Sequence, residues 1–421
     1  MIVVRNARVL RSDGIEQTTV VIEGDTIQTV GEEPAVNGAR VIDADGAWLG
    51  PGLVDLHVHF RDPGQTWKED IETGSRAAAA GGYTAVVAMP NTQPPIDGGD
   101  RAQAVMERAT AIGTLDVRAA GCLTRERAGT EMADFDSMYA AGVRIFSDDG
   151  DAVPDAGLLR RIMMYLRDLP GAVVADHAED RSLAGNGHLH DGVTAARHGI
   201  EGLPAVAEDV IVARDLELAN DTRSRIHVQH VSTANVVGLI RQARERGVNV
   251  TAEVTPHHLA LEESALESLD PNLKMYPPLR NAEDREALAE ALASGLIDAV
   301  ATDHAPHARA EKEVPFEEAP RGVIGLETAA AVVSSALGGD QALFFDRMSV
   351  APARIAGLDR QGIAVEPGSP ANLVLFAPQR RWTPGAYVSK SENGPFTGVE
   401  LTGKVLATIY EGRISHEEGS G

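Results

Sequence analysis

The chain has 421 residues, of which 43% are hydrophobic and 24% are charged, and this composition is typical of a folded protein. The 62 acidic and 38 basic residues give a net charge of −24, which repels phosphate backbones and anionic lipids and so argues against nucleic-acid and membrane-surface binding. The chain has one cysteine, Cys122, no apolar run of the ~18 residues that span a membrane and no apolar signal-peptide core near its N-terminus, so we expect a soluble cytoplasmic protein without disulfides.

Short segments rich in β-branched residues predict strands at both ends of the chain. Chain termini often lie close together, so these strands are expected to pair in one small β domain made of residues 1–50 and 359–421. The predicted strands cover residues 3–9, 18–22, 26–30, 372–376, 398–401 and 406–410.

Residues 51–358 show a different pattern, in which apolar strand segments alternate with helical segments. Eight such repeats predict a (β/α)8 TIM barrel, an α/β fold whose parallel strands are covered on both faces and are therefore apolar throughout. A doubly wound open sheet is the alternative architecture. The predicted strands cover residues 52–60, 84–90, 116–123, 143–147, 172–176, 225–230, 248–254 and 299–302. The predicted helices cover residues 68–80, 101–111, 156–169, 206–219, 234–246, 281–292 and 326–337.

Side chains that can bind a metal stand at the ends of several predicted strands. Barrel active sites lie at the carboxyl ends of the strands, so these side chains are expected to meet at one mouth and form a metal site. They are His57 and His59 on the first strand, Asp149 after the fourth, His177 after the fifth, His230 after the sixth and Asp303 after the eighth.

The histidine positions follow from strand geometry. Val58 separates His57 from His59, so both imidazoles face the same side of the strand and can hold one cation. A surface pair or a hydrogen-bonded core pair is the alternative, but the ligands at other strand ends favour metal binding. His227 and His230 are separated by an odd number of positions, so only one of them faces the mouth, and we expect it to be the terminal His230.

Two carboxylates complete the candidate ligand set. One carboxylate can bridge two cations, and a second can bind one metal while it faces the attacking water. A plain turn is the alternative for residues 148–150, whereas a charge that closes a buried strand, as Asp303 does, must be paired or metal-bound. His257 and His258 are expected to support the ligands or the fold and not to bind metal.

Eight short motifs, in this order along the chain, resemble the amidohydrolase superfamily in its class I (bacterial) dihydroorotase form. The matching motifs occupy residues 54–64, 88–92, 146–150, 177–180, 227–232, 253–258, 277–280 and 301–307. The resemblance as a whole runs from about Gly52 to Thr328, and the flanking strands are similar to the small composite β domain of that family. The resemblance therefore implies the same two-part fold.

The resemblance implies two zinc ions per chain, bridged by Asp149 and a hydroxide. One ion would be held by His57, His59 and Asp303, and the other by His177 and His230. The implied reaction is the reversible cyclisation of N-carbamoyl-L-aspartate to (S)-dihydroorotate plus water, a step of de novo pyrimidine (UMP) biosynthesis. Asp303 would be the catalytic residue that carries a proton between water and the leaving nitrogen.

Arg61 follows the first strand, and its guanidinium can hold a carboxylate of the substrate through two hydrogen bonds. A salt bridge to Asp62 or Glu69 is the alternative. The resemblance implies further substrate contacts from His59, Asn91, Tyr276, His307, Arg321 and Gly322.

Two of these positions depart from the family pattern. Tyr276 stands where asparagine is usual, so one hydroxyl replaces an amide donor and acceptor. Arg321 stands where an apolar residue is usual. Both changes bear on ring recognition, and neither touches a metal ligand. The polar segment 308–318 is either a mobile lid or an ordinary solvated loop.

Two alternative functions predict sequence features that can be checked in this chain. A hydantoinase or allantoinase would bridge its metals with a carboxylated lysine, but no lysine of this chain ends a strand between the second and the fifth. A catalytically silent subunit that supports aspartate transcarbamoylase would generally lack metal ligands, and all six are present. Association with aspartate transcarbamoylase and formation of a homodimer are the protein partnerships that the resemblance implies, besides a small-molecule substrate.

Overall fold

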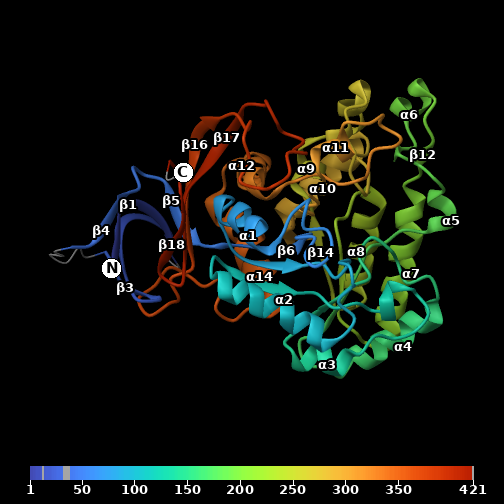
Figure 1. Cartoon of the computed structure of the whole chain (residues 1–421), viewed down its shortest axis with the longest axis horizontal. Helices are drawn as coiled ribbons and strands as arrows, with labels where there is room; N and C mark the ends of the chain where they lie inside the picture. The colour runs from blue at the N-terminus through green and yellow to red at the C-terminus, as the bar shows by residue number, and fades with distance from the viewer. Residues whose placement is uncertain (12–13, 32–37, 420–421) are drawn as a thin grey trace.

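The computed structural model describes residues 1–11, 14–31 and 38–419 (Figure 1). A sheet built from the two ends of the chain lies on the left of Figure 1, and the strands and helices of the middle of the chain lie on the right.

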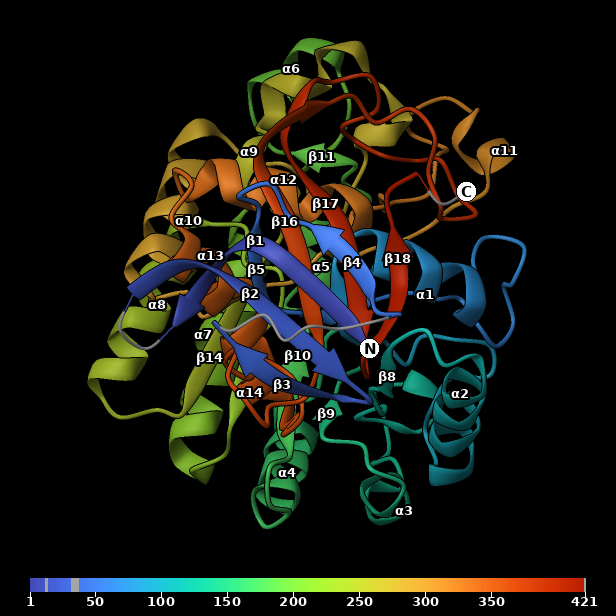
Figure 2. The same ribbon diagram turned by 90° about the vertical axis from the view of Figure 1, so that its left-hand side faces the viewer.

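Strands from both ends of the chain share one eight-stranded sheet, which faces the viewer in Figure 2. Its order is β18-β17-β16-β5-β1-β2-β3, and β4 also pairs with β1. The N-terminal and C-terminal strands are joined where β5 runs antiparallel to β16, with Leu49 opposite Leu375. The strands are β1 (Ile2–Arg11), β2 (Gly14–Glu23), β3 (Thr26–Val30), β4 (Arg40–Asp43), β5 (Trp48–Pro51), β16 (Leu373–Trp382), β17 (Leu401–Tyr410) and β18 (Arg413–Glu417).

The predicted strand over residues 398–401 is wrong. Residues 398–400 lie outside any strand, and Leu401–Tyr410 forms the single strand β17. Gly403 lies between the predicted strands 398–401 and 406–410, but it belongs to β17, where a Cβ atom would come within 2.6 Å of the Phe376 ring. The glycine therefore permits close packing inside a continuous strand.

The middle of the chain holds eight short parallel strands at the eight predicted positions. Strands β6, β7 and β8 form one ladder, and β15, β14, β13, β10 and β9 form another. Isolated parallel bridges between Gly121 and Phe146 and between Val58 and His304 connect the outer strands of the two ladders. The strands are β6 (Leu53–Val58), β7 (Tyr83–Ala88), β8 (Asp116–Ala119), β9 (Ile145–Phe146), β10 (Val173–Asp176), β13 (Ile226–Val228), β14 (Val250–Val254) and β15 (Ala299–Val300).

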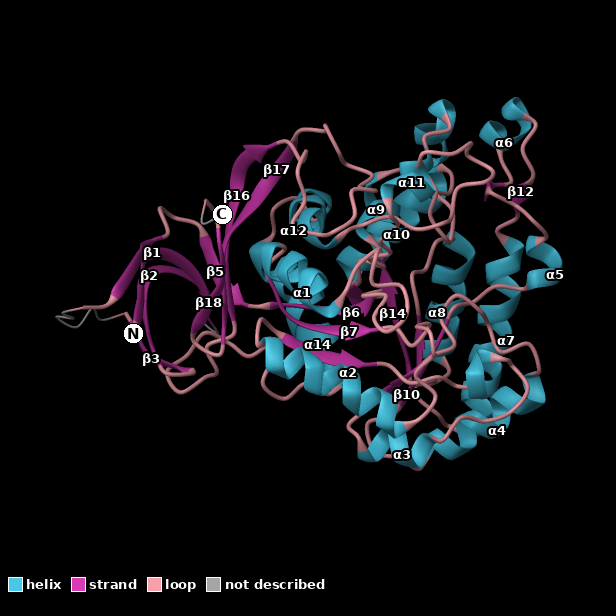
Figure 3. Cartoon of the chain, in the orientation of Figure 1, coloured by secondary structure: helices cyan, strands magenta, loops and turns pink. Residues whose placement is uncertain are grey.

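All seven predicted helices are present, and helices lie outside the strands in Figure 3. Several begin at a polar residue whose side chain accepts a hydrogen bond from the backbone of the first turn, among them Asp70, Asp155 and Asn281. The long helices are α1 (Ile71–Ala80), α2 (Gly99–Ile112), α4 (Ala156–Arg167), α7 (Val206–Thr222), α8 (Ala234–Glu245), α10 (Ala282–Ser294) and α12 (Leu326–Ala336). Shorter elements that were not predicted are α3 (Phe135–Ala140), α5 (Arg181–Ala184), β11 (Leu189–His190), α6 (Val193–His198), β12 (Gly202–Leu203), α9 (Pro256–Ala260), α11 (Arg309–Lys312), α13 (Gln341–Phe345) and α14 (Ala351–Ala356).

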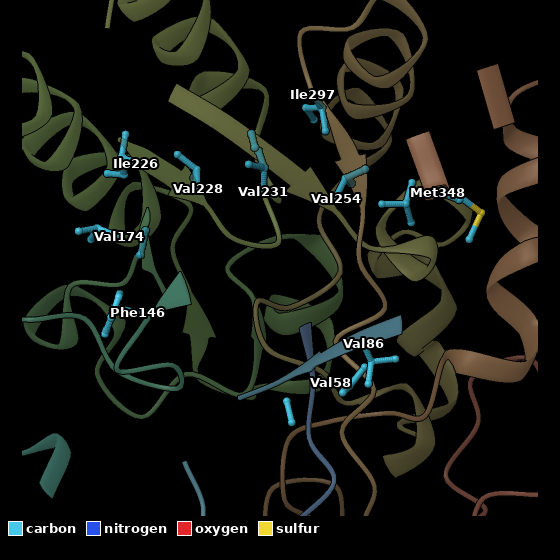
Figure 4. Packing of buried hydrophobic residues seen from close by; sticks show 14 of the residues in the cluster. Val58, Val86, Phe146, Val174, Ile226, Val228, Val231, Val254, Ile297 and Met348 are labelled. Atoms are coloured by element: carbon cyan, nitrogen blue, oxygen red, sulfur yellow. The ribbon is translucent and has the colours of Figure 1, made fainter. Parts of the chain in front are cut away.

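The parallel strands are buried on both faces. Val86 of β7 belongs to a large apolar cluster that includes Val174 and Val254 (Figure 4), whereas its neighbour Val87 packs in a second cluster with Ala175. Successive side chains of one strand thus enter two different apolar environments, which explains why these strands are apolar without alternation. Among the described residues, no helix is both long enough and apolar enough to cross a membrane.

Candidate functional site

The six candidate metal ligands come together at the carboxyl ends of the parallel strands. His57 lies within β6, and the others follow β6, β9, β10, β13 and β15 by one to three residues. Each of the six is at most 7% exposed. Their convergence from five strands follows from the shared direction of those strands.

Asp149 lies at the centre of this group. Its Oδ1 atom is 3.2 Å from Nε2 of His57, 3.5 Å from Nδ1 of His177 and 3.7 Å from Nε2 of His230. Its Oδ2 atom is 3.4 Å from Nε2 of His59. One carboxylate therefore faces four imidazoles. Burial alone would raise the pKa of Asp149, but the neighbouring imidazoles hold it well below its ordinary value.

Three of these ring nitrogens, Nε2 of His57, Nδ1 of His177 and Nε2 of His230, are buried and have no hydrogen-bond partner among the described residues. Buried polar atoms are normally paired, so three orphaned nitrogens aimed at one carboxylate fit the donor set of a transition-metal ion. His57, His59 and Asp303 form one group able to hold a metal ion, and His57, Asp149 and His230 form a second. The residues present therefore fit a metal site.

Asp303 lies on the other side of the same imidazoles. Its Oδ1 atom is 3.0 Å from Nε2 of His59 and 3.6 Å from Nε2 of His57. Burial alone would raise the pKa of Asp303, but the hydrogen bond from His59 and the charge of His57 keep it below its ordinary value. Asp303 can therefore both bind a cation and face the reacting atoms.

Three residues of the site have a positive φ although they are not glycine. The φ angle is 58° at Arg61, 30° at His230 and 47° at Asp303. Such conformations cost about 1–3 kcal/mol each and are retained where the surrounding structure holds them. Their occurrence at three strand ends of one mouth is typical of a functional site.

Two residues hold Asp149 in place. The side-chain amide of Asn91 donates to Oδ2 of Asp149 at 3.1 Å, and its Oδ1 atom is 2.9 Å from Nδ1 of His59. Nη2 of Arg127 donates to the carbonyl oxygen of Asp149 at 2.6 Å and to that of Asp148 at 3.1 Å. Asn91 was expected to contact substrate, and in this structure it also connects two candidate ligands. Arg127 was missed, because nothing in its local sequence marks a contact more than 20 residues away.

Glu253 was also missed as an individual site residue. It lies in β14, is 1% exposed and contacts both His57 and His227. The available signal was its position, since a carboxylate in an otherwise apolar buried strand needs a partner. His227 thus faces Glu253 in the interior, while His230 faces Asp149. His258 contacts Thr255 and the carbonyl oxygen of Pro278, away from the candidate ligands.

Arg61 does not form either of the alternative salt bridges. Asp62 pairs with Arg108 at 2.8 Å, and Glu69 lies 3.5 Å from His304. Among the described residues no carboxylate lies within 4.0 Å of the Arg61 guanidinium, whose Nε donates to the carbonyl oxygen of Pro306 at 3.3 Å. Burial lowers the pKa of Arg61. A half-buried cation without a close carboxylate is suited to bind an anionic ligand.

A cavity of about 130 Å³ opens above the cluster. Five of the six candidate ligands line it, all except His57, together with Arg61, Asn91, Tyr276, Arg321 and Gly322. The guanidinium of Arg321 lies 4.1 Å above the centre of the Tyr276 ring. The ring of His177 also lies next to the Tyr276 ring, with ring centres 4.9 Å apart. Both positions that depart from the family pattern therefore contact each other at the cavity wall.

His307 is not among the residues that line the cavity. Its Nε2 donates to the carbonyl oxygen of Arg321 at 2.8 Å, and its Nδ1 lies 3.3 Å from Nζ of Lys68. Burial, together with the charges of Arg61 and Lys68, lowers the pKa of His307 to about 2, so the ring is neutral. Both ring nitrogens are thus used within the protein, behind the wall that Arg321 and Gly322 form.

Segment 308–318 is not solvated along its whole length. It contains α11, and the side chains of Lys312 and Phe316 are each 5% exposed. Nζ of Lys312 donates to the carbonyl oxygens of Pro271 and Pro320, and Nζ of Lys274 donates to that of Phe316 at 2.7 Å. Two buried ammonium groups therefore attach this segment next to the cavity. Its action as a lid stays a prediction.

The chain is similar to known proteins over nearly its whole length. A family model described as "Dihydro-orotase-like" matches residues 46–236. The dihydroorotase of Streptomyces coelicolor is 43% identical over 424 residues, which cover 99% of this chain and 98% of that protein. The dihydroorotase of Mycobacterium leprae is 45% identical over 409 residues, which cover 95% of each. The chain belongs to the dihydroorotase family.

Solved structures of similar fold carry other names. The L-hydantoinase (dihydropyrimidinase) of Arthrobacter aurescens superposes with a TM-score of 0.86 at 27% identity and covers 100% of this chain and 96% of that one. A D-hydantoinase (dihydropyrimidinase) from Thermus sp. superposes with a TM-score of 0.82 at 24% identity, which shows a shared fold alone. The identity to members of the dihydroorotase family is clearly higher. Asp149 lies at the centre of the ligand cluster, and no lysine is among the described residues that line the cavity.

Proposed function

We propose that this protein is a class I dihydroorotase, a zinc-dependent cyclic amide hydrolase of the cytoplasm. It interconverts N-carbamoyl-L-aspartate and (S)-dihydroorotate plus water, in de novo pyrimidine (UMP) biosynthesis. The observation that carries this proposal is the convergence of orphaned, buried imidazole nitrogens on Asp149, below a cavity that Arg61 also lines. Membership of the dihydroorotase family supports the choice of substrate.

We also propose the domain organisation. Residues 51–358 form a closed (β/α)8 barrel, and residues 1–50 and 359–421 form the two parts of a small composite β domain. The parallel bridges Gly121–Phe146 and Val58–His304 support closure, because each of them connects one end of the β6-β7-β8 ladder to one end of the β15-to-β9 ladder. The pairing of β5 with β16 supports the composite domain.

In the proposed site, His57, His59 and Asp303 would hold one zinc ion, His177 and His230 would hold another, and Asp149 would be the ligand that bridges the two. When bound, zinc polarises the amide carbonyl and lowers the pKa of water to about 7. The two groups of potential ligands, which share His57, support a count of two.

The chain's own residues then perform the remaining steps. The carboxylate of Asp303 accepts a proton from the attacking water and returns it to the ring nitrogen that leaves, and the cyclisation runs the same transfer backwards. Arg61 binds the carboxylate of the substrate with Asn91 beside it, and His59 contacts the substrate next to Asp303. Gly322, Tyr276 and Arg321 bound the ring on the opposite side, and His307 holds the backbone of Arg321 in position.

Two measurements on the purified chain test this function. We expect turnover of dihydroorotate, two zinc ions per chain, and loss of activity on chelation that zinc restores. A chain that holds at most one metal ion at full activity would contradict the binuclear site. Faster turnover of dihydrouracil or hydantoin than of dihydroorotate would favour the hydantoinase alternative.

The proposal includes a homodimer and association with aspartate transcarbamoylase, which the family resemblance implies. Light scattering of the purified chain tests the first. Assay of dihydroorotate turnover with and without added transcarbamoylase tests the second. A monomer whose activity does not respond to the added enzyme would remove both partnerships.

A further inference from the structure

The carboxylate of Glu253 lies in the interior, beneath the candidate metal ligands. Its Oε1 atom is 3.1 Å from Nδ1 of His57, and its Oε2 atom is 3.0 Å from Nε2 of His227. His227 is held in turn by Thr251, whose Oγ1 atom is 2.8 Å from Nδ1. The side chain of Glu253 is 1% exposed, and the proposed reaction makes no use of it.

Burial of this carboxylate is costly. The adjacent residues of β14, Ala252 and Val254, are apolar and fully buried, so an apolar side chain would suit the strand at least as well. Its two oxygens contact imidazoles, and no ion pair with lysine or arginine is found for it in the described part of the chain. The presence of a buried carboxylate paired in this way is therefore not explained by a gain in the stability of the fold.

The contact with His57 decides which ring nitrogen carries the proton. A neutral imidazole has one N–H, and a carboxylate can only accept, so Nδ1 must be the donor to Glu253. The other nitrogen, Nε2, then keeps its lone pair. That nitrogen lies 3.2 Å from Asp149 and 3.6 Å from Asp303, where a metal ion would bind.

A second group competes for the same nitrogen. Nε2 of Gln229 lies 3.2 Å from Nδ1 of His57 and could donate to it only if that nitrogen had no proton. The proton would then sit on Nε2 and block the metal position. A hydrogen bond to a carboxylate is about twice as strong as one between neutral groups, so Glu253 prevails over Gln229.

We propose that Glu253 is a positioning residue that keeps His57 in the tautomer with a proton on Nδ1 and strengthens Nε2 as a metal ligand. His57 belongs to both groups of potential ligands, so Glu253 affects the binding of both metal ions. The inference rests on the proposed function, because it needs a resident metal. His227, which Thr251 holds, contacts the second oxygen and so keeps the carboxylate beside His57.

The test replaces Glu253 by glutamine, which has nearly the same shape. The amide of Glu253→Gln can still accept a hydrogen bond from His57 and can still contact His227, but it carries no charge. We expect zinc affinity, measured by competition with a chelator, to fall about 10- to 100-fold, with melting of the metal-free chain nearly unchanged. The visible spectrum of the cobalt-substituted variant should also differ from that of the parent.

A matched control is Glu327→Gln. The carboxylate of Glu327 accepts from the backbone amides of Val388 and Ser389 and touches no candidate ligand, so zinc affinity should stay as in the parent. Equal zinc affinity of Glu253→Gln and the parent would overturn the positioning role alone. A parent chain that binds no zinc would overturn both this role and the proposed function.

A measurement on the parent chain covers the case in which Glu253→Gln does not fold. Long-range proton–nitrogen correlations of the histidine-labelled, metal-free protein, recorded at a pH high enough to leave one proton on the His57 ring, report the tautomer of each ring, and the signals that vanish in His57→Asn belong to His57. We expect the tautomer protonated at Nδ1. A His57 ring protonated at Nε2 would overturn the inference.

Discussion

Replacing Tyr276 by leucine removes the aromatic face on which Arg321 rests. The guanidinium lies 4.1 Å above the ring centre, and the ring of His177 lies on the same tyrosine with centres 4.9 Å apart. The hydroxyl of Tyr276 forms no hydrogen bond within the described part of the chain. The ring face, and not the hydroxyl, therefore makes the contacts that shape this wall of the cavity.

A cation over an aromatic ring contributes about 0.5 kcal/mol at exposed sites and about 2 kcal/mol when desolvated. Those limits correspond to about 2-fold and 30-fold in kcat/KM, and the half-buried pair Tyr276–Arg321 lies between them, near fivefold. We therefore expect Tyr276→Leu to lower kcat/KM for dihydroorotate about fivefold. Tyr276→Phe keeps the ring face and should stay within about threefold of the parent.

The assay is steady-state turnover of dihydroorotate at constant zinc content. A double-mutant cycle adds Arg321→Met, and the two substitutions should be non-additive because they remove one shared contact. Tyr139→Leu is the control, since Arg144 lies 3.9 Å over the Tyr139 ring far from the cavity. It should lower stability and leave kcat/KM unchanged.

Two results would refute this reasoning. If Tyr276→Phe is as damaging as Tyr276→Leu, the hydroxyl contacts the substrate and the stacking argument is wrong. If the effects of Tyr276→Leu and Arg321→Met add without coupling, the stacked pair has no energetic role in the reaction.

Three further predictions test other parts of the site and the fold. Asp303→Asn should lower kcat by about 10²–10⁴-fold while the far-ultraviolet circular dichroism stays native, and a near-normal kcat would exclude proton transfer by this residue. Arg61→Met should raise KM for dihydroorotate strongly and affect turnover of dihydrouracil, which lacks the carboxylate, only slightly; equal losses would mean that Arg61 is structural. Burial raises the pKa of Glu327 to about 7 from 4.5, so the folded state binds a proton that the unfolded state has lost, and this contribution to stability fades as the pH rises through 7. The melting temperature of Glu327→Gln, measured relative to that of the parent, should therefore rise when the pH is raised from 5 to 8. A difference in melting temperature that stays constant over this range would contradict the raised pKa.

Local patterns were sufficient to locate the main elements. The parallel strands are apolar throughout because both faces are covered, and the helices between them carry polar caps, so both leave a signal within ten or so residues. Short elements outside the alternating pattern of strands and helices, such as β11 and α6, leave no such signal and were not predicted. The error at residues 398–401 has a related cause, since Gly403 marks close packing against Phe376, which lies elsewhere in the chain.

The convergence of the candidate metal ligands could be predicted from sequence alone, because parallel strands share one direction and the ligands stand at the ends of five of them. Whether Arg61 is free or paired with a carboxylate could not be predicted from the sequence. It depends on Arg108, which pairs with Asp62 and leaves Arg61 without a close carboxylate. The partner of Asp62 is therefore Arg108 of helix α2, and not Arg61, its neighbour along the chain.

Only the tertiary structure decided how the ligands are supported. Glu253 and His57 are 196 positions apart, and their contact depends on the register of β6, β13 and β14 around a common interior. The stacking of Arg321 on Tyr276 likewise joins two loops that no periodic pattern relates. Residue type and strand position are local properties of a sequence, whereas the partner of a buried side chain is set by packing across the whole fold.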